Sequence, residues 1–350
     1  MKAIVDSKIP YIRGQIERLV DEVIYMPGGS IDTKAAHDAE ILIVRTRTQC
    51  NRDLLHGSSV KFIVTATIGY DHIDTEYCKS NGIQWANCPG CNAKSVAQYV
   101  FNSLHVLGVM HSGKVIAEGM TIGVVGAGHV GSLVVKSSMN SGLSVIINDP
   151  PLEEKMTKEG KADMFVFASL NTICEQADII TFHTPLTYGG KYPTYHIAGA
   201  DFFRRLKHKP IIINASRGGV VDEHELKLAL KSGMVSHVVI DTWEHEPQID
   251  AELLSMADIA TPHIAGYSAN GKRNATLMSL ESVRQYILHN SNSSNISHKK
   301  CDEVNFDIPL PDLPLLTPAT LIDDSTKLKE NIDEFEDFRN NYPQRAENEI

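Results

Sequence analysis

The stretch TIGVVGAGHVGSLVVKSSMNSGLSVIIND, residues 121–149, decides the fold expected for this chain. A β-branched run over 121–125 leads into a glycine-rich turn, apolar residues then recur at helical spacing, and a second apolar run over 145–147 ends in an acid. Strand, turn, helix and strand around a G-x-G-x-x-G pattern predict a βαβ unit that binds a dinucleotide. The pattern alone would be weak, but its flanking strand, helix and terminal acid make a chance loop a poor explanation.

Each glycine of the pattern has a physical task. Gly126 allows the tight turn, Gly128 lets the backbone approach a pyrophosphate, and Gly131 lets the helix pack on the strand. The N–H groups at the start of the helix would face the anion. Asp149 stands where a carboxylate takes both ribose hydroxyls, and it would repel a 2′-phosphate. Because the two prolines that follow supply no arginine to hold such a phosphate, the sequence predicts NAD rather than NADP.

The composition fits a globular protein of two or three domains, since 350 residues exceed an average domain. The net charge of −10 argues against non-specific binding of nucleic acid, which needs a basic surface. No apolar run of about 18 residues is present, and the opening MKAIVDSKIP lacks the form of a signal peptide. We therefore expect a soluble cytoplasmic protein with neither nucleic acid nor membrane among its partners.

The six cysteines, at 50, 78, 88, 91, 174 and 301, lack the dense spacing of a disulfide framework. CPGC at 88–91 could be a redox pair or half of a zinc site, but no second CxxC or HxxxH completes a metal cage. A Pro-Gly turn flanked by cysteines is the favoured interpretation, and we expect reduced thiols and no metal.

The apolar runs before residue 90 predict a small α/β domain, with strands at 3–5, 41–44, 62–64 and 83–86. A helical stripe that begins just past Asn92 carries the chain into the nucleotide domain. A later stripe, from Leu277 to Ile287, is expected to return and pack on the first domain, which is therefore discontinuous. The expected boundaries are 1–93 with 265–289 for a substrate (lid) domain, 94–264 for the NAD-binding domain, and 290–350 for a C-terminal dimerisation segment.

Further strand-like runs follow the βαβ unit at 164–167, 179–182, 211–213, 238–240 and 258–260. Strands that alternate with helices indicate a parallel sheet covered on both faces. The predicted fold class is therefore α/β, with a Rossmann-type doubly wound parallel sheet inserted into a smaller flavodoxin-like α/β domain.

Polar clusters stand at the carboxyl ends of four of these runs, where ligands of such sheets bind. They read HTPLT, NASRGGVVDE, DTWEHEP and TPHIAGYS, and they contain Arg217, Glu246 and His263. Taken singly, these residues could be a surface salt bridge, a solvated acid and a core histidine. Four such clusters at successive strand ends instead favour a catalytic site.

Oxidation of an alcohol by NAD needs a base for the hydroxyl proton, and His263 can supply it. Glu246 would hydrogen-bond the other imidazole nitrogen, which fixes the tautomer and stabilises the imidazolium. Arg217 presents a planar fork for the substrate carboxylate and for charge on the C2 oxygen. The three side chains together predict a hydride-transfer site.

The motifs GAGHVG, NASRGGVVDE, DTWEHEP and PHIAG resemble those of the D-isomer-specific 2-hydroxyacid dehydrogenases. VRTRT at 44–48, TATIGYDHID at 65–74 and FRNNYPQR at 338–345 are similar to a branch of this family that acts on a phosphorylated hydroxy acid. The resemblance implies NAD-dependent oxidation of that small molecule to a 2-oxo acid by a homodimer. It also implies binding residues, which are Thr184, Ala215, Ser216, Asp241 and Gly266 for NAD and Thr46, Thr67 and Tyr267 for the substrate.

The substrate phosphate needs concentrated positive charge in an acidic protein. Arg45 is the first candidate, and Arg345 of a neighbouring subunit is the second. If the strand continued past residue 44, Thr46 would face away from Arg45. We therefore expect the chain to turn there, because a polar stretch begins at Thr46.

Two alternatives stay open at the level of sequence. The substrate could be 3-phosphoglycerate or another D-2-hydroxy acid, or the protein could be an NAD-sensing corepressor of the same fold. For the C-terminal part, the sequence predicts a linker at 291–297 and then an acidic helix with apolar residues at 332, 335 and 338. This segment is too small for its own core and should dock on its own subunit or on a partner, with disorder as the alternative.

Overall fold

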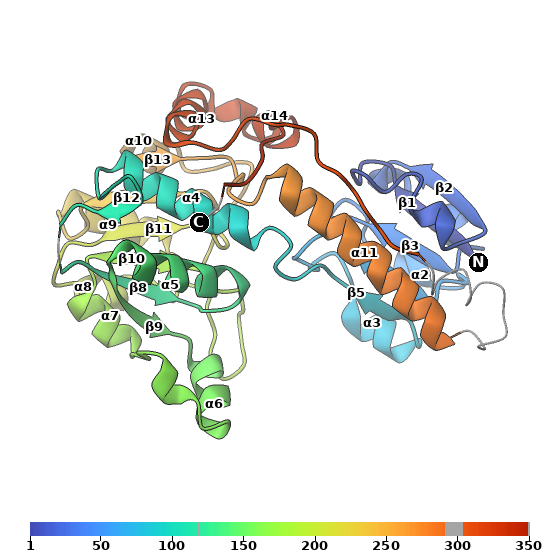
Figure 1. Cartoon of the computed structure of the whole chain (residues 1–350), viewed down its shortest axis with the longest axis horizontal. Coiled ribbons are helices and arrows are strands. Elements are labelled where there is room, and N and C mark those ends of the chain that lie inside the picture. The colour runs from blue at the N-terminus through green and yellow to red at the C-terminus, as the bar shows by residue number, and fades with distance from the viewer. Residues whose placement is uncertain (118, 291–303, 349–350) are drawn as a thin grey trace. The chain divides into compact units, whose positions relative to one another are not determined.

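The computed structural model describes residues 1–117, 119–290 and 304–348, and the chain divides into two compact units (Figure 1). The first unit comprises Met1–Asn92 and Ser268–Asp312, and the second comprises Ala93–Tyr267 and Leu313–Ile350. The sequence-based boundaries at 93 and 265 lie close to this division. The segment expected as a separate part from residue 290 is instead shared between the two units, and its role in a dimer stays a prediction.

The first unit is built on a parallel sheet with the strand order β2-β1-β3-β4-β5, which is the flavodoxin-like order. Four of the strands coincide with predicted runs, whereas β2 was not predicted. The strands are β1 (Lys2–Asp6), β2 (Glu22–Met26), β3 (Ile41–Val44), β4 (Phe62–Thr65) and β5 (Gln84–Ala86).

Alternate side chains of this sheet serve two cores. Ile41 and Ile43 of β3 pack with Leu280 and Val283 of α11 (Ala269–Asn290), as the sequence predicts for this returning helix. Leu42 and its neighbours pack on the other face. Because strand side chains alternate between faces, a continuous apolar run fills both cores at once. The other face is covered by α1 (Thr33–Ala36), α2 (Arg52–Leu55) and α3 (Thr75–Ser80), and short 3₁₀ helices lie at η1 (Ile16–Arg18) and η2 (Gly28–Ser30).

The second unit contains a six-stranded parallel sheet in the order β13-β12-β11-β10-β8-β9. Every strand matches a predicted apolar run to within one residue at each end. The strands are β8 (Thr121–Val125), β9 (Ser144–Asn148), β10 (Ile179–Phe182), β11 (Ile211–Asn214), β12 (His237–Ile240) and β13 (Ile259–Ala260).

The predicted strand at 164–167 is wrong. Those residues form the end of η3 (Ala162–Met164) and a single bridge between Phe167 and Ile147 beside β9. Met164 and Val166 are exposed, at 71% and 62%. The apolar run is continuous, but only Phe165 and Phe167 pack on the core, and the face with Met164 and Val166 is exposed, so pairing does not extend beyond the bridge.

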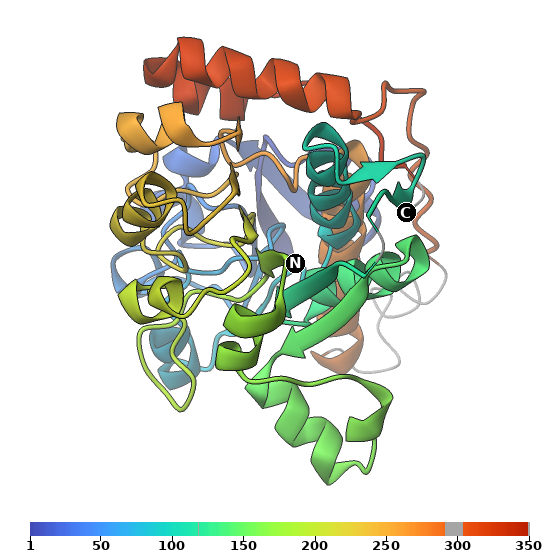
Figure 2. The ribbon, with the colours of Figure 1, turned by 90° about the vertical axis from the view of Figure 1, so that its left-hand side faces the viewer.

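Helices cover both faces of the sheet, so the unit is doubly wound as predicted (Figures 1 and 2). One face carries α4 (Ala93–Val106) and α5 (His129–Ser141). The other carries α7 (Leu170–Gln176), α8 (Ala200–Arg204), α9 (Glu223–Lys231) and α10 (Ala251–Met256). The remaining elements are α6 (Pro150–Lys158) and a hairpin of β6 (Met110–His111) and β7 (Lys114–Val115).

The C-terminal segment docks on the second unit through α13 (Pro318–Glu330), η4 (Ile332–Glu334) and α14 (Phe335–Asn340). Helix α13 contacts α4 and β13, and Figure 2 shows it running along that edge of the unit. Leu328 and Phe335 are buried in the core cluster beneath. The sequence left docking on its own subunit or on a partner open, and the described part of the segment packs on its own subunit. The predicted linker at 291–297 lies outside the described residues.

Candidate active site

The glycine-rich turn between β8 and α5 has the tight packing that its sequence predicts. Gly126 has a φ of +88°, and a Cβ on it would lie 2.8 Å from the carbonyl oxygen of His183. A Cβ on Gly131 would lie 1.9 Å from the carbonyl oxygen of Gly126. A Cβ on Gly128 would meet nothing within 4 Å. Gly126 and Gly131 therefore require glycine for packing, whereas Gly128 faces open space that a phosphate group could enter.

Polar groups around this turn fit a dinucleotide. Helix α5 has Gly128 as its N-cap, which provides no side-chain acceptor for the first N–H groups. Asp149 lies beside the turn, where its Oδ2 accepts the N–H of Ala127 at 2.8 Å and its Oδ1 accepts the N–H of Leu152 at 3.0 Å. Thr184 Oγ1 is buried near Gly126 and has no hydrogen-bond partner within the described part of the chain. Such a buried hydroxyl suits a ligand that brings its own polar atoms.

The loop after β11 carries Ala215, Ser216 and Arg217. Asn214 shapes this loop, because its Oδ1 accepts the Ser216 hydroxyl at 2.9 Å and its Nδ2 donates to the Arg217 carbonyl at 3.1 Å. A Cβ on Gly218 would lie 1.9 Å from the carbonyl oxygen of Trp243. The loop therefore packs directly on the segment after β12, which contains Glu246.

His263 and Glu246 form a hydrogen-bonded pair. The His263 Nδ1 lies 2.8 Å from Glu246 Oε2 and 3.1 Å from Oε1, and the Trp243 N–H donates to Oε1 at 2.9 Å. Burial by itself would raise the pKa of Glu246, but the bond from His263, the Trp243 N–H and the charge of Arg339 hold that pKa below its ordinary value. The carboxylate therefore stays ionised and accepts a proton-bearing Nδ1, which leaves Nε2 to act as a base.

The backbone at His263 is held in an unusual conformation by Asp241. His263 has a φ of +57°, and its N–H donates to the Asp241 carbonyl at 2.8 Å. The Asp241 carboxylate accepts the Thr261 hydroxyl at 2.7 Å and the N–H groups of Ile264 at 2.7 Å and Ala265 at 3.0 Å. Asp241 thus fixes the loop that presents the imidazole, and the predicted contact of Asp241 with NAD stays a prediction.

The residues that follow His263 continue this loop. Tyr267 closes a turn through its N–H, which donates to the Ile264 carbonyl at 2.8 Å, so Gly266 lies inside that turn. The Tyr267 ring meets the ring of Tyr342 edge to face, with centroids 6.2 Å apart. The C-terminal segment therefore borders the loop of the predicted base.

Three of the predicted substrate residues belong to the first unit. Arg45 follows β3 directly, and the Thr48 N–H donates to its carbonyl at 3.1 Å, so the chain turns at Thr46 as expected. Arg45 Nε donates to the fully buried Asp6 at 3.0 Å. Thr67 Oγ1 donates to the Gly69 carbonyl at 2.8 Å. Part of the positive charge of Arg45 is therefore already balanced inside the protein.

Lys272 on α11 was not predicted. Burial lowers the pKa of this ammonium, and the nearby positive charge of Arg45 lowers it further. Two cations that lie near each other and are partly shielded from water are typical of an anion-binding site. In the sequence, Lys272 looks like an ordinary helix residue, because its proximity to Arg45 arises only from the fold.

The second phosphate candidate, Arg345, is corrected by the structure. Arg345 is buried, and its Nη1 donates to Asp324 at 2.8 Å and to the Tyr342 hydroxyl at 2.6 Å. Because its guanidinium is committed to its own chain, it cannot serve the substrate of a neighbouring subunit. Arg339, four residues beyond Phe335, was missed by the sequence analysis and lies 3.3 Å from Glu246.

Cys88 is held as a buried thiol. Its Sγ donates to the Ala275 carbonyl at 3.2 Å, and burial raises its pKa to about 11. The thiol is therefore protonated at neutral pH, which argues against a redox role for CPGC. The five cysteines that lie among the described residues are not joined in disulfide bonds. In the same part of the chain, no helix is long and apolar enough to cross a membrane.

Comparisons with known proteins agree with this geometry. Residues 110–265 match the family model of the D-isomer specific 2-hydroxyacid dehydrogenase, NAD binding domain. A protein of Bacteroides thetaiotaomicron named erythronate-4-phosphate dehydrogenase is 49% identical over 99% of this chain and 97% of its own length. A protein of the same name from Escherichia coli O81 is 42% identical over 83% of this chain and 74% of its own length.

Solved structures share the fold. The D-lactate dehydrogenase of Aquifex aeolicus, complexed with NAD and lactic acid, superposes with a TM-score of 0.63 at 23% identity and covers 83% of this chain and 96% of its own. A glyoxylate reductase from Paecilomyes thermophila superposes with a TM-score of 0.66 at 24% identity, over 82% of this chain and 95% of its own.

A dinucleotide turn and a histidine–glutamate pair in one doubly wound domain define an NAD-dependent dehydrogenase. The chain belongs to the D-isomer-specific 2-hydroxyacid dehydrogenase family, and the curated relatives reported above share the name erythronate-4-phosphate dehydrogenase.

Proposed function

We propose that this protein oxidises 4-phospho-D-erythronate with NAD to 3-hydroxy-2-oxo-4-phosphobutanoate, a step of pyridoxal 5′-phosphate biosynthesis. The observation that carries the chemistry is the 2.8 Å hydrogen bond between His263 and Glu246, beside the loop of Arg217. The 49% identity to a relative named for this substrate, over nearly the whole of both chains, supports the choice of substrate. A homodimer in the cytoplasm is part of the same proposal and rests on the family resemblance.

Each member of the site has a distinct task in this proposal. His263 Nε2 takes the proton of the C2 hydroxyl, because its Nδ1 proton is engaged by Glu246. The Glu246 carboxylate stabilises the imidazolium that forms. Arg217 holds the substrate carboxylate with its planar fork. NAD, when bound, accepts the hydride that leaves C2.

The cofactor is assigned to the glycine-rich turn and the neighbouring strand ends. Gly126 and Gly131 build the turn, and Gly128 leaves space for the pyrophosphate. Asp149 would take the ribose hydroxyls, and Thr184 offers a buried hydroxyl that lacks a partner among the described residues. The other proposed NAD contacts are Ala215, Ser216, Asp241 and Gly266.

The phosphate is assigned to the first unit, where Arg45 and Lys272 lie close enough to repel each other. Asp6 balances part of the Arg45 charge, so the second cation is needed to attract a phosphate of nearly two negative charges. Thr46 and Thr67 of the same unit and Tyr267 of the second unit complete the proposed substrate residues.

The proposal is tested by adding NAD and 4-phosphoerythronate to the pure protein and following NADH by its absorbance. We expect turnover with NAD and far less with NADP. Unphosphorylated erythronate and 3-phosphoglycerate should be poor substrates. Faster turnover of 3-phosphoglycerate would replace the substrate but keep the chemistry, whereas NAD binding without turnover of any hydroxy acid would favour a corepressor.

The phosphate assignment makes its own prediction for Lys272→Met and Arg45→Ala. Both should raise the KM for 4-phosphoerythronate, by about 10- to 100-fold, since a desolvated phosphate contact is worth roughly 2 kcal/mol. The KM for unphosphorylated erythronate should change much less. Arg45→Ala also leaves Asp6 buried and unpaired, so the ratio of the two KM values, rather than either alone, is the measurement. Equal losses on both substrates would show that the cations serve the fold or the carboxylate.

A further inference from the structure

The C-terminal helix α14 reaches the predicted catalytic pair. Arg339 Nη1 lies 3.3 Å from Glu246 Oε2, the same oxygen that accepts the His263 Nδ1 bond at 2.8 Å. The other carboxylate oxygen accepts the Trp243 N–H at 2.9 Å. Glu246 is only 16% exposed, and Arg339 is 33% exposed. The carboxylate is therefore enclosed by three donors, one of which comes from a segment 93 residues further along the chain.

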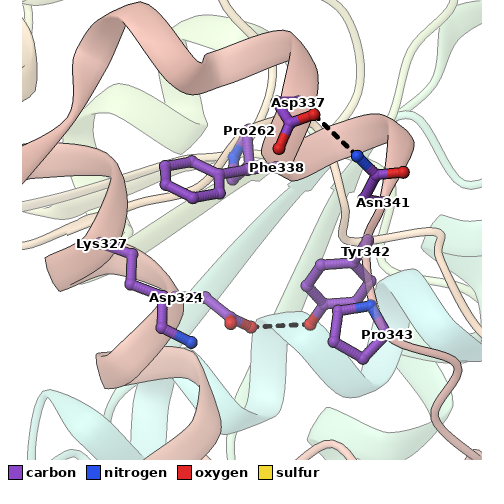
Figure 3. A pocket seen from close by; sticks show the side chains of 8 residues that line it. All are labelled: Pro262, Asp324, Lys327, Asp337, Phe338, Asn341, Tyr342 and Pro343. Atoms are coloured by element: carbon purple, nitrogen blue, oxygen red, sulfur yellow. Dashed lines mark hydrogen bonds between the residues drawn. The ribbon is translucent and has the colours of Figure 1, made fainter.

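Helix α14 is held firmly enough to place this arginine. Phe335 at its start is 1% exposed in the core cluster, and Phe338 packs on the same cluster. Beyond its end, the Tyr342 hydroxyl donates to Asp324 of α13 at 2.7 Å (Figure 3). Arg345 donates to the same carboxylate at 2.8 Å. Anchors on both sides of Arg339 fix the helix against α13.

The same segment also borders the histidine loop. Pro262, the residue before His263, lines a small hollow together with Phe338 of α14 and Tyr342 (Figure 3). Asp324 and Lys327 line this hollow from α13. The docked segment therefore contacts Glu246 through Arg339 and the histidine loop through the ring contact between Tyr342 and Tyr267.

We propose that Arg339 is a positioning residue for the reaction, which from the C-terminal segment fixes the Glu246 carboxylate and offsets its charge toward His263. The proposal rests on the proposed dehydrogenase function of the pair. Oxidation begins with a neutral imidazole, whereas the negative charge of Glu246 favours the protonated form. A guanidinium 3.3 Å from the oxygen that accepts the His263 bond moderates this effect and holds the carboxylate in place.

Other charged groups around the pair are accounted for. Asp241 interacts electrostatically with His263 from the preceding strand end, and its own pKa is raised by burial. On the C-terminal segment, Asp324 is paired with Arg345 at 2.8 Å, and Asp337 faces Asn341 at 2.7 Å. Lys327 lines the hollow beside Pro262, and Arg339 is the cation of the described segment that reaches the Glu246 carboxylate, at 3.3 Å.

The test is a pH titration of the His263 imidazole, monitored by NMR in NAD-free protein. The His263 signal is assigned as the one that is missing from the spectrum of His263→Asn. In Arg339→Gln, we expect the protonation midpoint to rise by about half a pH unit, because the carboxylate loses its second cation. The acid limb of kcat/KM for oxidation should move to higher pH by the same amount. At a pH below that limb, the activity should fall about threefold. Arg339→Lys should restore most of the shift.

A matched control is Arg204→Gln, which removes an exposed arginine of the same unit on α8 and should leave both profiles in place. The NMR readout requires no substrate, so it can fail or succeed independently of the proposed function. A midpoint that stays unchanged or falls in a folded Arg339→Gln would overturn the proposal. If Arg339→Gln melts early, the folded Arg339→Lys and Arg339→Met variants give the same comparison.

Discussion

Two buried glutamates of the NAD-binding unit differ in the direction of their pKa shifts. Burial by itself would raise the pKa of both side chains. Glu246, after β12, nevertheless has a pKa below its ordinary value, because His263, the Trp243 N–H and Arg339 favour its charged form. At Glu246, these donors therefore outweigh the effect of burial on the pKa.

Glu223, at the first position of α9, lies in the opposite environment. Burial raises its pKa to about 8; the Glu244 N–H counteracts this rise, whereas the nearby acids Glu244 and Asp250 add to it. At neutral pH, Glu223 is therefore a neutral acid that takes part in packing. The contrast shows that two acids of one unit, both shielded from water, shift their pKa values in opposite directions because their donors and neighbouring charges differ.

The largest effect is expected from a substitution at His263. His263→Ala removes the group that Glu246 is charged to support, so turnover should fall by about 10²- to 10⁴-fold while NAD still binds. Steady-state kinetics and cofactor titration measure the two effects separately. Activity within tenfold of the unmodified protein would remove His263 from the role of base.

The success of the sequence analysis in this region has a physical reason. Buried parallel strands such as 179–182 are continuous apolar runs, so the polar residues after them mark the carboxyl edge where Glu246 and His263 lie. The edge strand β2 was not predicted, although VIYM at 23–26 is an apolar run, and it is only partly buried in the structure. The prediction of a strand at 164–167 failed because the run has the right residues but no covering layer on one of its faces.

The contacts that sequence reasoning missed are those made by distant segments. Arg339 meets Glu246 across 93 residues, and Lys272 comes near Arg45 only because α11 returns to the first sheet. Arg345 was assigned to a phosphate on the strength of its charge, whereas the fold pairs it with Asp324. Spacing and periodicity describe neighbours along an element, and these partners depend on how whole elements pack.

A smaller effect is expected from Glu246→Gln. Its single oxygen cannot serve the donors at both carboxylate oxygens, so one hydrogen bond is lost, worth about 1–1.5 kcal/mol or roughly tenfold in turnover. Without the negative charge, the imidazolium is less stable, and the acid limb of oxidation should move to lower pH. This direction is opposite to that of Arg339→Gln. A pH–rate profile with an unmoved limb would separate Glu246 from the proton transfer.

The smallest effect should come from Glu223→Gln, and it should appear in stability rather than in turnover. The folded protein keeps the Glu223 proton up to about pH 8, whereas an unfolded chain releases it near the ordinary value of 4.5. Between these values the folded state binds more protons, so the free energy of unfolding contributed by this group falls as pH rises. Glutamine keeps the oxygen that accepts the Glu244 N–H but has no proton to lose. Denaturant unfolding at about pH 6 and about pH 9 should therefore show a loss for the unmodified protein that is about 2–3 kcal/mol larger than for Glu223→Gln, whereas Glu225→Gln on the same turn should resemble the unmodified protein. A pH dependence that Glu223→Gln leaves intact would show that this acid is already ionised in the folded protein, and the contrast between the two glutamates would then be lost.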